Sequence, residues 1–200
     1  RINGALWPPF IRSDEDKNLK QLQRHGINTN VLYNDAEQGF QICRYVDQSV
    51  QYTHAYRARH ALVNLGRVIC KYHTQVNFNN QYPLAHVMHS SFNKMAVKDR
   101  TNLNNHYTLI QRMLLKLIDD RQNTVASHND LLPSSVYADG QNVTIVDWEY
   151  SARNHRSYDL ALFSLKSALP PAHEQLLIAA YDPTDSYQTG YTVRIMKPIV

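Results

Sequence analysis

Glycine is scarce in this chain of 200 residues, which contains only six. They lie too far apart to build a glycine-rich phosphate loop, and neither G-x-x-x-x-G-K-[ST] nor G-x-G-x-x-G occurs. The chain therefore has neither a P-loop nucleotide site nor a Rossmann dinucleotide site. Any nucleotide bound here would have to be held by other groups.

Cysteine is also scarce, and long apolar runs and blocks of like charge are absent from the sequence. The two cysteines, Cys43 and Cys70, form no C-x-x-C pair, and their apolar neighbours predict small core residues in a reducing cytoplasm. No apolar run reaches about 18 residues and no signal-peptide pattern occurs, so we expect no membrane partner. The net charge is +4 with scattered basic residues, which is compatible with anionic ligands such as nucleotides but indicates no nucleic-acid tail.

The first part of the chain predicts a small unit of one helix and two strands. A helix over Ser13–His25 would be capped by Ser13, carry acidic residues in its first turn and end at Gly26. Two short strands, Asn30–Tyr33 and Phe40–Val46, flank a polar turn and are typical of a hairpin.

The remainder predicts helices interrupted by short strands. Apolar residues recur at helical spacing in three segments: Ala55–Tyr72, Leu84–Met95 and Asn102–Asp120. Three β-type runs follow, the last two joined by a turn at Gly140: Thr124–Ser127, Ser135–Tyr137 and Val143–Trp148. Helices return after Ser157, one of them from Pro171 or Ala172 to about Tyr181. This order predicts an α+β fold of two lobes, residues 1–47 and 48–200.

Two polar clusters carry the strongest chemical signal. Ser127–Pro133 and Ile145–Tyr150 each follow a short apolar run, which places Asp130 and Asp147 at strand ends on either side of a hairpin. One carboxylate can accept a proton from a hydroxyl while the other holds a hard cation. Phosphoryl transfer requires both roles. Each cluster alone is equally typical of a solvated turn.

Together and in this order, the clusters resemble the choline/ethanolamine kinase family, within the aminoglycoside-phosphotransferase-like kinases. The family pattern is H-N-D-L-x-P-x-N, a hairpin, I-D-[WF]-E-Y, and an aromatic-Asp pair opening a helix. The chain matches it at three places: His128–Ser135, Ile145–Tyr150 and Tyr158-Asp159. Weaker matches extend the resemblance upstream: Arg1–Gly4, Arg12 with Glu15, Phe40–Val46, and Tyr72–Asn79. The motif residues are most similar to those of the bacterial choline-kinase branch.

The resemblance implies a two-lobed protein-kinase-like fold and roles for the matched residues. Asp130 would be the catalytic base toward the substrate hydroxyl, and His128 would brace the catalytic loop. Asp147 would bind the Mg²⁺ that carries the ATP phosphates. Ser135 stands where the family places asparagine as the second metal ligand, and a serine hydroxyl is a weaker ligand.

The nucleotide would be held by the first lobe. Arg1 and Glu15 would form the pair that positions the phosphates, with arginine in place of the lysine of protein kinases. Tyr45 and Val46 would belong to the hinge that receives adenine. The glycine-rich turn expected before Arg1 is missing, and the family continues beyond Val200. We therefore expect the chain to lack the first strands and last helices of the kinase.

Four residues near the second motif are candidates for the substrate site: Glu149, Tyr150, Tyr158 and Asp159. Aromatic faces and carboxylates suit a quaternary amine, although Glu149 could equally form a salt bridge, and Trp148 is expected to pack in the core. The resemblance implies ATP- and Mg²⁺-dependent transfer to a small cationic alcohol, choline or ethanolamine. The alternatives are a degenerate kinase fold without efficient transfer, and the same fold acting on an aminoglycoside or thiamine. The sequence leaves the substrate and the oligomeric state open.

Overall fold

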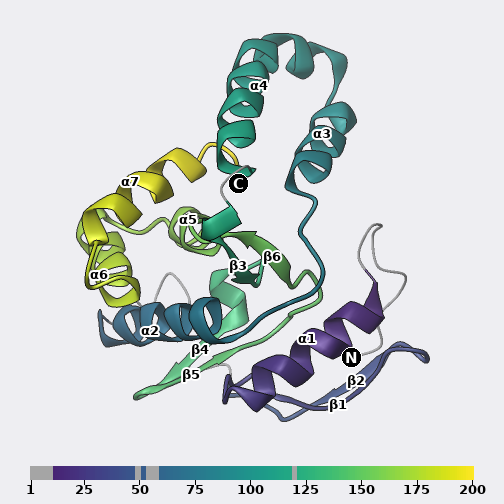
Figure 1. Ribbon diagram of the computed structural model, residues 1–200, viewed down its shortest axis with the longest axis vertical. Helices are drawn as coiled ribbons and strands as arrows, with labels where there is room; N and C mark the ends of the chain where they lie inside the picture. Colours follow the sequence, from purple (N-terminus) through teal and green to yellow (C-terminus); the bar gives the residue numbers. More distant parts are fainter. Residues whose placement is uncertain (1–10, 48–50, 53–58, 119–120) are drawn as a thin grey trace.

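The computed structural model describes residues 11–47, 51–52, 59–118 and 121–200, in which helices surround small antiparallel sheets (Figure 1). The elements follow in this order: α1 (Arg12–Arg24), β1 (Val31–Asp35), β2 (Phe40–Cys43), α2 (Arg59–Gln75), α3 (Leu84–Lys94), α4 (Val97–Ile118), η2 (Arg121–Asn123), β3 (Thr124–Ser127), η3 (Pro133–Ser135), β4 (Val136–Asp139), β5 (Asn142–Ile145), β6 (Ala152–His155), α5 (Tyr158–Lys166), α6 (Pro171–Tyr181) and α7 (Ser186–Met196). The elements confirm the predicted mixture of helices and strands. The division near residue 47 stays a prediction.

Helix α1 lies beside the hairpin β1–β2, as the sequence predicted (Figure 1). The helix begins one residue early, with Ile11 as its N-cap and no side-chain cap, so the predicted capping role of Ser13 is wrong. It ends at Arg24, and Gly26 follows two residues later with a φ of 65°, a left-handed conformation that glycine adopts without strain. Strand β2 stops at Cys43, short of the predicted Val46. Cys43 is exposed rather than a core residue.

Helices α2 and α6 form the centre of the larger part of the structure. Helix α6 appears where the sequence predicted it, whereas α2 extends to Gln75, beyond the predicted end at Tyr72, and its predicted start at Ala55 lies outside the described residues. They approach very closely at Gly66, because a Cβ there would lie 2.6 Å from the Leu177 carbonyl oxygen and 2.9 Å from the Ala180 Cβ. Around this point lies the apolar core, which includes the fully buried Leu62 and Leu65. Glycine is therefore required for the packing of these two helices.

Two short strand pairs present the loops that carry the polar motifs. Strands β3 and β6 pair antiparallel from Thr124↔His155 to Ser127↔Ala152, and β4 pairs with β5 across the predicted Gly140 turn. The predicted strand over Val143–Trp148 ends at Ile145, because the next residues turn and Asp147 adopts a φ of 64°. Strand β6 was not predicted from the sequence, because its residues are mostly polar and do not alternate with apolar ones.

Helices α3 and α4 form an antiparallel hairpin that projects from the rest of the molecule, above β3 and β6 in the view of Figure 1. Helix α4 begins at Val97, five residues before the predicted start at Asn102, and the predicted end at Asp120 lies outside the described residues. Helix α7 was not predicted from the sequence and lies beside α6. Within the described ranges, no helix is both long and apolar enough to cross a membrane.

Candidate active site

The loop after β3 brings the first polar motif against the second. The His128 imidazole bridges them, because its Nε2 lies 2.8 Å from the Val146 carbonyl oxygen and its Nδ1 accepts the Asp130 backbone N–H at 3.2 Å. These partners assign the proton to Nε2. The His128 ring also packs against Trp148 at 4.6 Å between centroids. This geometry suits the bracing role expected for His128, and Trp148 is buried in the core as predicted.

Asp130 lies half-buried in this loop, within electrostatic range of the carboxylates of the second motif. Burial raises the pKa of Asp130, the charges of Glu149 and Asp147 raise it further, and the neighbouring His128 and Lys166 oppose the rise. The structure thus brings the three predicted acidic residues into one electrostatic environment. Such a cluster is unfavourable unless a proton or a cation neutralises part of its charge.

A backbone hydrogen bond holds the segments that carry Asp147 and Ser135 side by side in space. The Val146 N–H, one residue before Asp147, donates to the Ser135 carbonyl oxygen at 3.0 Å. Asp147 is exposed and Ser135 is buried in the short helix η3. Within the ranges that the structure describes, no three His, Cys, Asp or Glu side chains form a metal cage. A cation at Asp147 would therefore depend on few protein ligands, which is usual for Mg²⁺ bound together with phosphates and water.

Asp159 was predicted to contact the substrate, but it lies in the interior of the protein. Its carboxylate is fully buried and accepts backbone N–H groups from His128 at 2.8 Å and Asn129 at 2.9 Å. The Tyr72 hydroxyl donates to it at 2.8 Å, and His73 Nε2 lies 3.4 Å away. Because Asp159 has no exposed surface, the structure favours a structural role for it over the substrate contact, which stays a prediction. Asp159 anchors the catalytic loop.

The Asp159 carboxylate stays charged although burial opposes the charge. The hydrogen bond from His73 and the backbone N–H of His128 hold the pKa of Asp159 below its ordinary value. Burial lowers the pKa of His73, against the opposing effect of Asp159. The network continues outward through the Tyr181 hydroxyl, 2.9 Å from His73 Nδ1, and Arg156 Nε, which donates to that hydroxyl at 3.1 Å.

Asn129 is a site residue to which the sequence analysis gave no role. It adopts a φ of 67°, and its amide nitrogen donates to the carbonyl oxygens of Tyr150 at 2.9 Å and Ala152 at 3.2 Å. Asn154, on β6, donates in turn to the Asn129 side-chain oxygen at 2.8 Å. The available signal was the asparagine between His128 and Asp130, since asparagine tolerates left-handed backbone better than most residues.

The residues expected to hold the nucleotide are only partly described. Glu15 is buried on α1, where its carboxylate accepts a hydrogen bond from Gln41 Nε2 at 3.4 Å. Arg1 lies outside the described residues, so the pair that it forms with Glu15 stays a prediction. Tyr45 is 80% exposed and Val46 is half-buried, both in the extended segment after β2.

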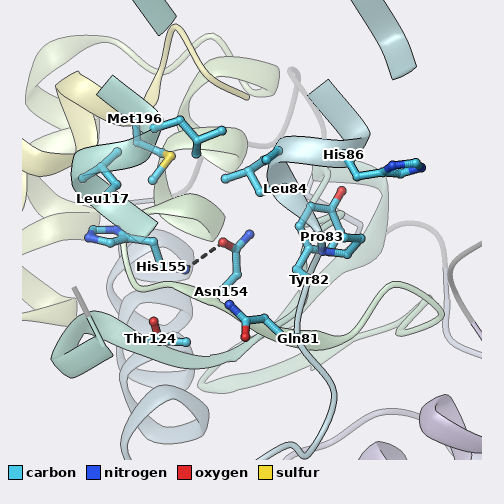
Figure 2. A pocket seen from close by; sticks show the side chains of 12 residues that line it. Gln81, Tyr82, Pro83, Leu84, His86, Leu117, Thr124, Asn154, His155 and Met196 are labelled. Carbon is cyan, nitrogen blue, oxygen red and sulfur yellow. Dashed lines mark hydrogen bonds between the residues drawn. The ribbon is translucent and has the colours of Figure 1, made fainter. Parts of the chain in front are cut away.

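A cavity of about 400 Å³ lies between the start of α3, the end of α4 and the pair β3–β6 (Figure 2). Leu84, Leu117 and Met196 form its apolar side, and Asn154 faces it from β6. Tyr158 lines a separate cavity of about 330 Å³ between α3 and α4. Both cavities are thus lined by residues of the projecting hairpin α3–α4.

Comparisons with known proteins agree with the motif order. The sequence profile described as choline/ethanolamine kinase matches residues 1–186. A curated relative, the protein LicA homolog of Mycoplasma capricolum subsp. capricolum, is 24% identical over 120 residues, which cover 54% of this chain and 50% of that protein. The chain therefore spans about half the length of the curated relative that it matches.

Solved structures share the fold. A choline/ethanolamine kinase family protein from Mesorhizobium loti superposes with a TM-score of 0.79 at 20% identity, covering 94% of this chain and 67% of that one. A structure of LicA in complex with AMP gives a TM-score of 0.76 at 19% identity, covering 94% of this chain and 66% of that one. The fold is accordingly the predicted kinase-like fold. Because the profile covers nearly all of the sequence, the chain belongs to the choline/ethanolamine kinase family.

Proposed function

We propose that the protein is a small-molecule kinase that transfers the γ-phosphoryl group of ATP to the hydroxyl of a small cationic alcohol, most simply choline or ethanolamine. The observation that carries the proposal is the placement of Asp130, on a loop anchored by a buried carboxylate, beside Asp147 and Glu149. Phosphoryl transfer needs a positioned nucleophile and neutralised charge, and this arrangement suits both needs.

Asp130 is the proposed base. Its half-buried position and its raised pKa favour proton acceptance from an alcohol as the oxygen attacks. The Asp130 backbone is fixed by its own N–H to His128 and by the hydrogen bonds that Asp159 accepts from the two preceding residues. A fixed backbone keeps the carboxylate oriented toward the hydroxyl, which is the larger part of catalysis in this class of reaction.

Asp147 and Ser135 are the proposed ligands of Mg²⁺. The donor set fits a hard cation, because an exposed carboxylate stands within a cluster whose negative charges repel one another. A bound Mg²⁺ would neutralise the phosphates of ATP. We place adenine at Tyr45 and Val46 and the phosphates near Arg1 and Glu15. The AMP complex of LicA, a protein of similar fold, supports the proposal that this fold binds a nucleotide.

The cationic end of the substrate is proposed to meet tyrosines and a carboxylate. Tyr82 and Tyr158 lie with ring centroids 5.5 Å apart and are hydrogen-bonded to each other, and the pKa of Tyr82 is raised first by burial and then by the charges of Asp130 and Tyr150. With Glu149, this group offers both the aromatic faces and the negative charge that bind quaternary amines. The same chemistry would accept other cationic alcohols.

A substrate panel tests the proposal. The full-length protein is incubated with ATP, Mg²⁺ and separately choline, ethanolamine, thiamine or an aminoglycoside, and phosphorylated products are measured by mass spectrometry. We expect phosphorylation of choline or ethanolamine. Product from an aminoglycoside or thiamine alone would contradict the substrate class, and absence of any product from folded, nucleotide-binding protein would favour the degenerate fold.

A further inference from the structure

Three consecutive carbonyl groups just after the second motif are bound by asparagine side chains. The Tyr150 and Ala152 carbonyl oxygens accept from Asn129, in the catalytic loop. The intervening Ser151 carbonyl oxygen accepts from Asn18 at 2.9 Å and from Asn80 at 2.8 Å. The segment is thus held from two sides by residues far away in the sequence.

Asn18 contributes its hydrogen bonds from helix α1. Its amide nitrogen also lies 3.1 Å from the Ser151 hydroxyl and 3.0 Å from the Asn80 side-chain oxygen, so its two protons serve three acceptors. Asn18 and Ser151 are 3% and 2% exposed. If Asn18 moved away from these acceptors, its buried amide would be left without hydrogen bonds, at a cost in free energy. The contact therefore fixes the position of Asn18 relative to Ser151.

The same helix face carries the carboxylate expected near the nucleotide phosphates. Glu15 precedes Asn18 by three residues, and both are buried, so they lie on one side of α1. On the other side of the contact, Ser151 follows the Asp147–Tyr150 segment directly, and its N–H donates to the Trp148 carbonyl oxygen at 2.9 Å. A movement of α1 would therefore pull on the loop that carries Asp147.

We propose that Asn18 is a positioning residue that couples the nucleotide end of the site, on α1, to the cation end, at Asp147, through the backbone of Ser151. The inference rests on the proposed function and adds to it a cooperative dependence of nucleotide binding on Mg²⁺. Asn80 supports the contact by holding the same carbonyl group. Asn129 links the same segment to the loop of Asp130. The backbone of residues 150–152 therefore connects α1, the loop of Asp130 and the loop of Asp147.

The test compares ADP affinity with and without Mg²⁺ by titration calorimetry. Variant Asn18→Ala removes the coupling contact. The matched control, Gln23→Ala, removes another hydrogen bond of α1, from Gln23 Nε2 to the Val31 carbonyl oxygen at 2.9 Å on the exposed side of the helix. We expect Mg²⁺ to tighten ADP binding by about 5- to 150-fold in the wild type and the control, as is usual for coupled sites. In Asn18→Ala the effect should be at least about threefold smaller, and what remains would come from the direct contact of Mg²⁺ with the phosphates.

Hydrogen exchange of the ligand-free proteins provides the second readout. Asn18→Ala should speed exchange of the amides of residues 148–152, while Gln23→Ala should leave them at the wild-type rate. If Asn18→Ala fails to fold, Asn18→Ser replaces it, because its shorter side chain removes the amide donor from the Ser151 carbonyl oxygen and keeps a polar group at the position. That variant should show a Mg²⁺ effect smaller than the effect in the wild type and in the control.

Two results would overturn the inference. A folded Asn18→Ala, or Asn18→Ser where it serves as the replacement, that retains the full wild-type Mg²⁺ effect would show that α1 and Asp147 are not coupled through this contact. Failure of the wild type to bind ADP under either condition would instead overturn the proposed function, and the coupling with it. Because the hydrogen-exchange comparison contains no ligand, it separates these two failures.

Discussion

Replacement of Asp159 by asparagine tests whether this buried carboxylate anchors the catalytic loop. Asparagine keeps the shape of the side chain but can place an oxygen at only one of the two carboxylate positions. One oxygen now accepts from the Asn129 N–H, and the other from the His128 N–H and the Tyr72 hydroxyl. Either orientation of the amide therefore directs an NH₂ group at a backbone N–H, and the negative charge is removed.

The expected loss of stability follows from the hydrogen bonds that this substitution breaks. Hydrogen bonds to a buried charge contribute about 1.5–3 kcal/mol each, and breaking a buried charged network typically costs about 3–5 kcal/mol. We expect Asp159→Asn to lower the free energy of unfolding by about 3–5 kcal/mol. Tyr72→Phe, which removes one donor and keeps the carboxylate, should lower it by only about 1–2 kcal/mol.

Urea denaturation followed by circular dichroism measures both variants, with a pH series as a further check. Because the pKa of Asp159 is depressed in the folded protein, its stabilising contribution is present above its unfolded pKa of about 3.9 and is lost as the pH falls through the depressed value. The asparagine variant should lack this pH dependence. A variant that is destabilised by less than about 1 kcal/mol while its substrate KM rises would refute the anchoring role and support the substrate contact predicted from the sequence.

Three other predictions concern separate parts of the molecule. Asp130→Ala should abolish phosphoryl transfer while changing the unfolding free energy by less than about 1 kcal/mol; near wild-type turnover would show that Asp130 is not the base. The acid limb of kcat/KM should lie above the ordinary pKa of an aspartate, move down in Glu149→Gln and move up in Lys166→Gln, since the two charges act oppositely on Asp130; unchanged pH profiles would contradict this. Gly66→Ala should lower the unfolding free energy by about 1–3 kcal/mol, because the new Cβ would lie 2.6 Å from the Leu177 carbonyl oxygen; an unchanged melting temperature would mean that α2 and α6 can separate at little cost.

The sequence predicted those elements whose signals are local. Helix α6 begins at Pro171 and ends at Tyr181 as expected, because proline favours the first turn of a helix and the apolar spacing continues to the end. The hairpin β4–β5 was equally predictable, since Asp139 and Gly140 form a recognisable turn. The two polar motifs were found because each lies at the end of a short apolar strand.

The remainder depends on contacts that no local pattern contains. Strand β6 exists because its backbone pairs with β3, although its own residues are polar. Asp159 resembles an exposed residue at a helix start, and only the fold reveals that the N–H groups of His128 and Asn129 point at it. The role of Asn18 was hidden for the same reason, because its partner Ser151 lies far along the chain.

In the proposed reaction, Asp130 accepts the proton of an alcohol as its oxygen attacks the γ-phosphorus of ATP. Phosphorus NMR of the full-length protein with ATP, Mg²⁺ and choline, or ethanolamine in a parallel sample, tests this most directly, with Asp130→Ala as the control. We predict that the γ-phosphorus signal of ATP gives way to a phosphomonoester signal in the wild type only, and only when the alcohol is present. Release of inorganic phosphate alone would contradict transfer to an alcohol, and a phosphomonoester formed equally by Asp130→Ala would contradict the role of Asp130 as the base.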